Sequence, residues 1–201
     1  MKSSRVKTRL SSVLSEEQRT EFSRSLLFDL IDVLRVTGLL RASRVVSSDT
    51  KILEFAAKKG TKVVTEDRDA GVNRAVQNGL ATLEGDEDVL VLPSDLALLR
   101  PSELRRLLRL KSAGLDVVIS PSTRFNGTNA LLFSSTSGFP LSYDDDSFWN
   151  HLASCGRLGL SAGVCCEEGL MFDVDTPDDL RLLSRSRLKR RSAAFARAVL
   201  A

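Results

Sequence analysis

The chain has 201 residues, of which 42% are hydrophobic and 27% charged, and its formal net charge is +3. This length and composition suit one globular domain with a full hydrophobic core, argue against a disordered chain and point to no particular partner. The sequence has no Cys-x-x-Cys pair, no apolar run long enough to span a bilayer and no signal-peptide pattern, which favours a cytoplasmic protein without a zinc site, a disulfide framework or a membrane anchor.

Helical and strand-like segments alternate along the first half of the chain. Residues 15–18 have the signature of a helix start, and apolar residues at helical spacing follow up to Gly38. Asp49 is placed to cap a second helix, which Gly60 ends. The last strand before residue 100 is a continuous apolar run, so we expect it to be central and covered on both faces. The expected elements are helices over 16–38, 50–59 and 71–79 and strands at 44–48, 62–65 and 88–93.

The alternation continues in the second half, where Pro101 suits the first turn of a helix. Strands separated by single helices indicate βαβ units and a largely parallel sheet. We therefore predict an α/β fold with one domain over residues 1–201, a mostly parallel sheet and a basic C-terminal helix over 185–201. The other expected elements are strands at 115–119 and 130–133, a helix at 148–153, and a helix that Thr176 and Pro177 open.

Three aspartates are candidate ligands, and ligands of such sheets bind beyond the carboxyl ends of strands. Asp95 comes just after the apolar strand and is either a loop cap or a ligand. Asp173 and Asp175 project to one side of an extended segment, because residues two apart do so. Such paired carboxylates repel each other and suit Mg²⁺, although Asp175 could instead only cap the helix after it.

The sequence leaves the roles of several other polar residues open. Lys7 and Arg9 could bind a polyanion, but most such pairs are solvated surface. Residues 126–129 could hold a small anion or simply form a turn. His151, the only histidine, is interpreted first as a helix-packing residue.

The basic segment 185–197 is compatible with nucleic-acid binding. It contains a single aromatic residue, Phe195, and the chain has no helix-turn-helix or RNA-recognition motif. A solvated helix face is the better interpretation, so we expect no nucleic-acid partner.

Four segments, taken in order, resemble the 2-phospho-L-lactate guanylyltransferase family. They are KTRL at 7–10, SDLALL at 94–99, GTNAL at 127–131 and FDVDTPDDL at 172–180, and GVNRA at 71–75 and SFWNH at 147–151 also look like family signatures. The resemblance implies a Rossmann-like, three-layer nucleotidyltransferase fold similar to molybdenum-cofactor guanylyltransferase. It also implies that GTP condenses with 2-phospho-L-lactate and releases pyrophosphate in coenzyme F420 biosynthesis. Phosphoenolpyruvate or 3-phosphoglycerate as the acid, and a nucleotide-binding remnant without activity, are the alternatives.

The resemblance also implies roles for individual residues. Asp95, Asp173 and Asp175 would be catalytic and hold Mg²⁺; Lys7, Arg9, Asn73 and Ser94 would bind the nucleotide; Thr128 and Ser147 would bind the acid. A homodimer and hand-over of the product to the downstream transferase of the pathway are left open. The family's apolar first strand has no counterpart in the six residues before Lys7, so we expect this strand to be missing.

Overall fold

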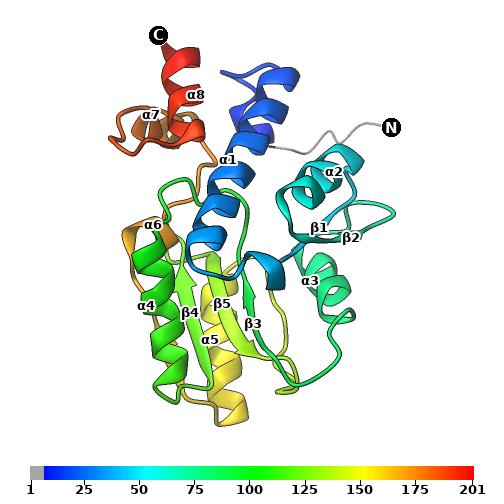
Figure 1. The fold of residues 1–201 in the computed structure, drawn as a ribbon. Coiled ribbons are helices and arrows are strands. Elements are labelled where there is room, and N and C mark those ends of the chain that lie inside the picture. Colours follow the sequence, from blue (N-terminus) through cyan, green and yellow to red (C-terminus); the bar gives the residue numbers. More distant parts are fainter. Residues whose placement is uncertain (1–6) are drawn as a thin grey trace.

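The computed structural model describes residues 7–201, in which the strands form two sheets (Figure 1). The expectation of a missing first strand concerns residues 1–6 and lies outside this range. In the smaller sheet, β1 (Arg44–Ser47) pairs in parallel with β2 (Lys62–Thr65). The larger sheet has the order β3-β5-β4-β6, with β3 at Asp88–Val91, β5 at Thr128–Ser134, β4 at Val117–Pro121 and β6 at Ala162–Val164.

The α/β fold class is confirmed, but the larger sheet is mixed and only partly parallel. Strand β5 runs antiparallel to both β3 and β4, whereas β4 and β6 are parallel. Only residues 122–127 join β4 to β5. A parallel pair needs a crossover of a dozen or more residues, so this short connection forces an antiparallel turn.

Strand β3 lies at an edge of the larger sheet within the described chain, so its expected central position is wrong. Its apolar sequence still has a physical reason. Leu90 packs against the core on one face of the sheet, while Val89 and Val91 pack against the core on the other face. Burial on both faces therefore does not require a neighbour on both edges.

The helices begin and end at local signals. Ser15 and Gln18 form a capping box at the start of the long helix α1, and Asp49 accepts hydrogen bonds from the backbone N–H groups of Lys51 and Ile52 at the start of α2. Gly60, at φ 96°, ends α2 in the left-handed conformation that glycine permits. The helices are α1 (Glu16–Val36), α2 (Thr50–Lys59), α3 (Val72–Leu80), α4 (Pro101–Ser112), α5 (Ser147–Leu158), α6 (Glu168–Met171), α7 (Pro177–Ser184) and α8 (Arg191–Leu200), with 3₁₀ turns at Thr8–Leu10 and Leu40–Ala42.

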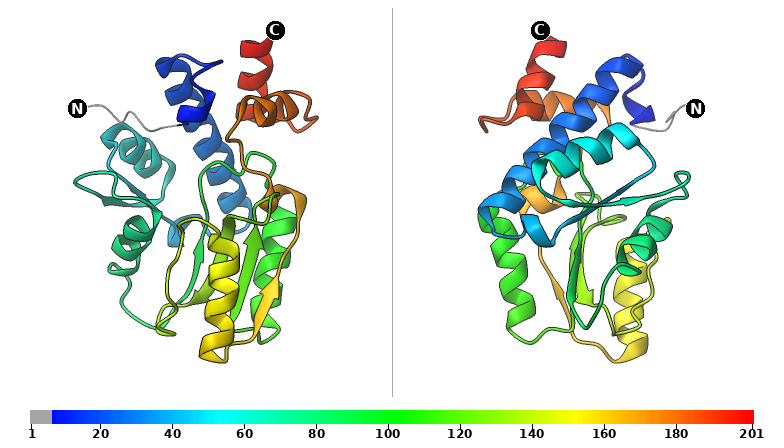
Figure 2. Two further views of the ribbon diagram at one scale, coloured as in Figure 1. Left: turned by 180° about the vertical axis from the view of Figure 1, so that it is seen from behind. Right: turned by 45° about the vertical axis from the view of Figure 1, so that its right-hand side comes forward.

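Helices cover both faces of the larger sheet, which gives three layers. Leu30 of α1 and Leu104 of α4 pack with Leu132 of β5 on one face. Phe148 of α5 packs with Phe133 of β5 on the other face, and α5 lies in front of the sheet when the molecule is seen from behind (Figure 2). Among the described residues, no helix is both long and apolar enough to cross a membrane.

The expected continuous helix over 185–197 is interrupted, because α7 ends at Ser184 and α8 starts at Arg191. Asp29 of α1, only 3% exposed, determines this start. Its carboxylate accepts hydrogen bonds from the backbone N–H groups of Arg191 and Ser192 and from the Ser192 hydroxyl. Helices α1, α7 and α8 thus form one cluster, which also buries Leu10 and so holds the segment that carries Lys7.

Candidate active site

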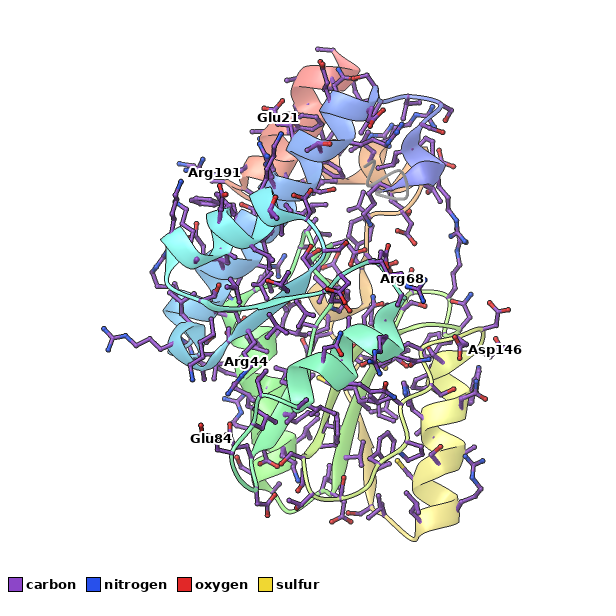
Figure 3. The ribbon with its side chains drawn as sticks, turned by 90° about the vertical axis from the view of Figure 1, so that its right-hand side faces the viewer. Glu21, Arg44, Arg68, Glu84, Asp146 and Arg191 are labelled. Carbon is purple, nitrogen blue, oxygen red and sulfur yellow. The ribbon has the colours of Figure 1, made fainter. Side chains whose placement is uncertain are left out.

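A cavity of about 1160 Å³ is lined by residues of both sheets and of α1. Figure 3 views the molecule from the side of the smaller sheet, with Arg68 labelled after β2 and Asp146 labelled ahead of α5. Of the residues with a predicted site role, those that line this cavity are Lys7, Arg9, Ser94, Asp95, Thr128, Ser147, Asp173 and Asp175. Segments from both ends and the middle of the sequence therefore meet at one site.

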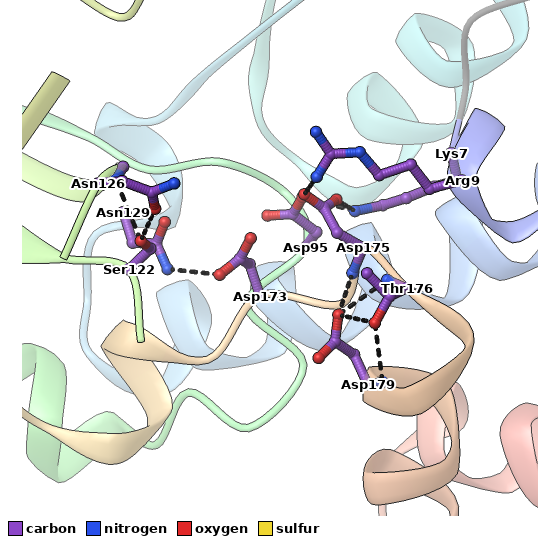
Figure 4. Close-up of polar contacts among 11 residues, drawn as sticks. Lys7, Arg9, Asp95, Ser122, Asn126, Asn129, Asp173, Asp175, Thr176 and Asp179 are labelled. Atoms are coloured by element: carbon purple, nitrogen blue, oxygen red, sulfur yellow. Dashed lines mark hydrogen bonds and ion pairs between the residues drawn. The ribbon is translucent and has the colours of Figure 1, made fainter. Parts of the chain in front are cut away.

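Lys7 joins two of the three predicted catalytic aspartates (Figure 4). Its Nζ lies 2.6 Å from Oδ2 of Asp95 and 2.9 Å from Oδ1 of Asp175. Burial alone would lower the pKa of Lys7, but attraction to these two carboxylates outweighs it and the pKa lies above its ordinary value. The Lys7 side chain is therefore a buried cation at neutral pH.

Asp173 completes the group of carboxylates. Asn129 donates a hydrogen bond of 3.1 Å from Nδ2 to Oδ1 of Asp173. Burial raises the pKa of Asp173, the bond from Asn129 opposes this rise, and repulsion from Asp95 and Asp175 adds to it. Three carboxylates thus share a site that holds one buried ammonium, and a further cation there would relieve their repulsion.

One feature of this site argues against a bound Mg²⁺ and another argues for it. Within residues 7–201, no three His, Cys, Asp or Glu side chains gather in a ready-made metal cluster, and Lys7 lies between two of the predicted ligands. However, Oδ1 of Asp95 is buried and has no hydrogen-bond partner among the described residues. A buried carboxylate oxygen normally has a partner, and Mg²⁺ prefers such oxygen ligands. The donor set therefore fits the ion.

The alternative reading of Asp175 as a helix cap is wrong. The hydroxyl of Thr176 caps α7 by accepting a hydrogen bond from the backbone N–H of Asp179. In return, Oδ2 of Asp179 accepts from the backbone N–H groups of Asp175 and Thr176. This reciprocal pair leaves the carboxylate of Asp175 free to bind Lys7.

Two other residues predicted on the nucleotide side lie at the rim of the cavity. The side chain of Arg9 is 69% exposed, and its Nη1 lies 3.8 Å from Oδ2 of Asp175. Ser94 is exposed next to Asp95. Both side chains are accessible to a ligand that reaches the carboxylates.

Asn73 does not line the cavity, and its role at the nucleotide stays a prediction. Its Nδ2 donates to Oδ2 of Asp144, and its Oδ1 accepts from the backbone N–H of Tyr143. Because these bonds use both ends of the side-chain amide, Asn73 ties α3 to the loop ahead of α5.

Thr128 of β5 and Ser147 at the start of α5, both predicted on the acid side, also line the cavity. Oγ1 of Thr128 lies 2.9 Å from Nδ1 of His151, which is completely buried. The backbone N–H of Gly127 instead donates to the hydroxyl of Ser122, so the glycine amide closes a turn. Thr128 therefore lines the cavity directly after a closed turn.

The sequence does not reveal the partners of three residues that shape the site: Asn129, His151 and Asp179. Asn129 lies in the family-like segment 127–131, but nothing in the sequence pairs it with Asp173, 44 residues later. Asp179 had a local signal, since it is the fourth residue of the Thr176 capping box. His151 is interpreted first as a packing residue, because a lone histidine has no motif that reveals its partner.

Comparison with known proteins identifies the family. The family model described as "Guanylyl transferase CofC like" matches residues 1–197. The chain belongs to this family of guanylyltransferases. The family consists of nucleotidyltransferases, and the sequence resemblance to 2-phospho-L-lactate guanylyltransferases is confirmed.

Individual relatives of the family differ in the acid that their names give. The chain is 36% identical to a phosphoenolpyruvate guanylyltransferase of Rubrobacter xylanophilus, over 90% of this chain and 88% of the relative. It is 33% identical to a 2-phospho-L-lactate guanylyltransferase of Methanocaldococcus infernus, over 87% and 77%. It is 30% identical to a 3-phospho-D-glycerate guanylyltransferase of Phenylobacterium zucineum, over 93% and 88%.

The fold is also similar to that of a solved structure. A putative nucleotide-diphospho-sugar transferase from Desulfovibrio desulfuricans superposes with a TM-score of 0.73 at 21% identity, over 96% of this chain and 88% of that one. This similarity confirms the α/β fold class.

Proposed function

We propose that this guanylyltransferase condenses GTP with 2-phospho-L-lactate, giving lactyl-2-diphospho-5′-guanosine and pyrophosphate as a step of coenzyme F420 biosynthesis. The observation that carries the proposal is the meeting of Lys7, Asp95, Asp173 and Asp175 at one cavity in a chain of this family. GTP and free thiols are both typical of the cytoplasm, where we place the reaction.

In the reaction we propose, an oxygen of the acid's phosphate attacks the α-phosphorus of GTP. The new P–O bond forms as the bond between the α-phosphorus and the bridging oxygen breaks, and the electron pair of that bond leaves with pyrophosphate. The attacking oxygen is already ionised at neutral pH, so no general base is needed. The enzyme must instead bring two polyanions together in the right orientation.

The residues of the cavity divide this task between them. Asp95, Asp173 and Asp175 would hold Mg²⁺, and the chemistry that a bound Mg²⁺ supplies is neutralisation of charge on the reacting phosphates. Lys7 and Arg9 would bind the triphosphate and the departing pyrophosphate. Thr128 and Ser147 would bind the phosphate or carboxylate of the acid.

Phosphoenolpyruvate is the second candidate substrate, and a specific observation favours it. The Rubrobacter relative named for phosphoenolpyruvate is 36% identical to this chain, compared with 33% for the Methanocaldococcus relative named for 2-phospho-L-lactate. 3-Phosphoglycerate is a third candidate for the same reason, at 30%. The three acids share a phosphate and a carboxylate on three carbons, so the same cavity groups would serve each.

A substrate panel tests the proposal. Pyrophosphate release is measured with GTP or ATP against each of the three acids, with Mg²⁺ and with excess chelator. We expect release with GTP and 2-phospho-L-lactate only when Mg²⁺ is present. Faster release with phosphoenolpyruvate would favour the second candidate, and no release from folded protein with any pair would favour a nucleotide-binding remnant.

A further inference from the structure

The hydrogen bonds of His151 determine which of its nitrogens carries the proton. The backbone N–H of Ser142 donates to Nε2 of His151 at 3.1 Å, and a backbone amide can only donate. Nε2 must therefore be the unprotonated nitrogen of the ring. In a neutral imidazole the proton then lies on Nδ1, which faces Oγ1 of Thr128 at 2.9 Å.

The surroundings of His151 keep the ring neutral and fixed. The residue is completely buried, and burial lowers its pKa to about 4. The rings of Phe139 and Tyr143 lie 5.8 and 5.0 Å from the imidazole, measured between centroids. An imidazole so enclosed keeps a single tautomer and a single orientation at neutral pH.

This arrangement also determines the role of the Thr128 hydroxyl. Because Nδ1–H donates to Oγ1, the hydroxyl hydrogen of Thr128 must point away from His151. No described residue accepts a hydrogen bond from this hydroxyl, although Thr128 is 93% buried and lines the cavity. A buried hydroxyl normally finds an acceptor, and here the acceptor would come from a ligand.

We propose that His151 is a positioning residue that holds the Thr128 hydroxyl as a hydrogen-bond donor to a phosphate or carboxylate oxygen of the acid substrate. The inference rests on the proposed function for the identity of the acid. It gives the buried histidine, which the transfer reaction does not need as a base, a role in binding.

The tautomer can be measured without any substitution, because His151 is the only histidine of the chain. In protein labelled with ¹⁵N-histidine, two-bond ¹H–¹⁵N correlation spectra at pH 7 distinguish the two ring nitrogens. We expect a protonated Nδ1 and an unprotonated Nε2. A proton on Nε2, or on both nitrogens, would overturn the proposal.

The second half of the test measures binding of 2-phospho-L-lactate by calorimetry, so it does not depend on turnover. Thr128→Val should weaken binding about 10- to 100-fold, because a neutral donor to a charged acceptor is lost, and should leave GTP binding unchanged. Thr128→Ser, which keeps the hydroxyl, should restore binding, and His151→Phe should weaken it. Thr136→Val, an exposed substitution just beyond the end of β5, is the matched control and should leave binding of 2-phospho-L-lactate unchanged.

The outcomes separate this inference from the proposed function. If the wild type turns over GTP and the acid but Thr128→Val binds the acid normally, the inference is wrong and the function stands. If the wild type shows no turnover but binds the acid, and Thr128→Val binds the acid more weakly, the function is wrong and the inference stands. Failure of the wild type to bind the acid at all would contradict both.

Discussion

The ammonium nitrogen of Lys7 lies 2.6 Å from Oδ2 of Asp95, a residue 88 positions later in the chain. The same nitrogen also binds Asp175, so one lysine joins the loop after β3 to the segment ahead of α7. This cation occupies the place between two carboxylates where we propose that Mg²⁺ is held. Lys7 and a divalent ion should therefore compete for Asp95 and Asp175.

The first prediction tests this competition. Lys7→Met should bind Mn²⁺, a spectroscopic substitute for Mg²⁺, about tenfold more tightly, since loss of a competing cation changes the binding free energy by roughly 1.4 kcal/mol. Titration followed by electron paramagnetic resonance, without nucleotide, measures the effect. Arg9→Met is the control and should have a smaller effect, because its exposed guanidinium lies 3.8 Å from Asp175. Unchanged or weaker Mn²⁺ binding in Lys7→Met would contradict the competition.

The second prediction concerns pH and stability. The pKa of His151 falls from 6.5 in the unfolded chain to about 4 in the fold, so the unfolded state binds a proton that the native state does not. The resulting contribution, on the order of 3 kcal/mol, is present above pH 6.5 and is lost as the pH falls towards 4. Urea unfolding at a series of pH values should show a shallower decline for His151→Asn than for the wild type. Parallel curves of unfolding free energy against pH for the two proteins would show that the pKa of His151 is not lowered in the fold.

The third prediction concerns the close approach of α6 to the loop ahead of α4. A Cβ atom on Gly169 would lie 2.6 Å from the carbonyl oxygen of Leu98 and would also meet the carboxylate of Glu103. Gly169→Ala should therefore reduce the free energy of unfolding by about 1–3 kcal/mol. In Gly156→Ala, by contrast, no atom lies within 4 Å of the added Cβ, and this helical substitution should stabilise the protein. Equal unfolding midpoints for the two variants would be incompatible with this packing.

The fourth prediction concerns the anchoring of α8. Asp29→Ala should cost about 2–3 kcal/mol, because it leaves the first N–H groups of α8 buried without an acceptor. Asp32→Asn on the same helix is the control. It removes an exposed pair with Arg35 and should cost less than about 0.5 kcal/mol. Comparable losses in the two variants would show that Asp29 does not anchor α8.

Local signals made much of the fold predictable from sequence. Asp49 and Gly60 fixed the limits of α2, and the capping box at Ser15 fixed the start of α1. The errors concern strand pairing, which depends on distant residues. The apolar sequence of β3 indicates that both faces of the strand are buried, but it does not indicate the place of β3 in the strand order. The break in the helix before Arg191 depends on Asp29, 162 residues earlier.

The candidate site shows the same division. The position of Asp95 after a strand and the spacing of Asp173 and Asp175 indicated the carboxylates correctly as neighbours of one cavity. The partners that orient them could not be predicted, because Lys7 and Asn129 reach these carboxylates through tertiary contacts. The bonds from Asn73 to the loop ahead of α5 could not be predicted either, because its partners lie about 70 residues later in the chain.

The most direct test of the central claim, that these carboxylates support guanylyl transfer, is the formation of lactyl-2-diphospho-5′-guanosine by the wild type and by Asp95→Asn, followed by mass spectrometry. Asp178→Asn, whose side chain is 84% exposed on α7, is the matched control. We predict Mg²⁺-dependent product from the wild type and the control, and a loss of at least about 100-fold in folded Asp95→Asn. Near-normal product formation by folded Asp95→Asn would contradict the account.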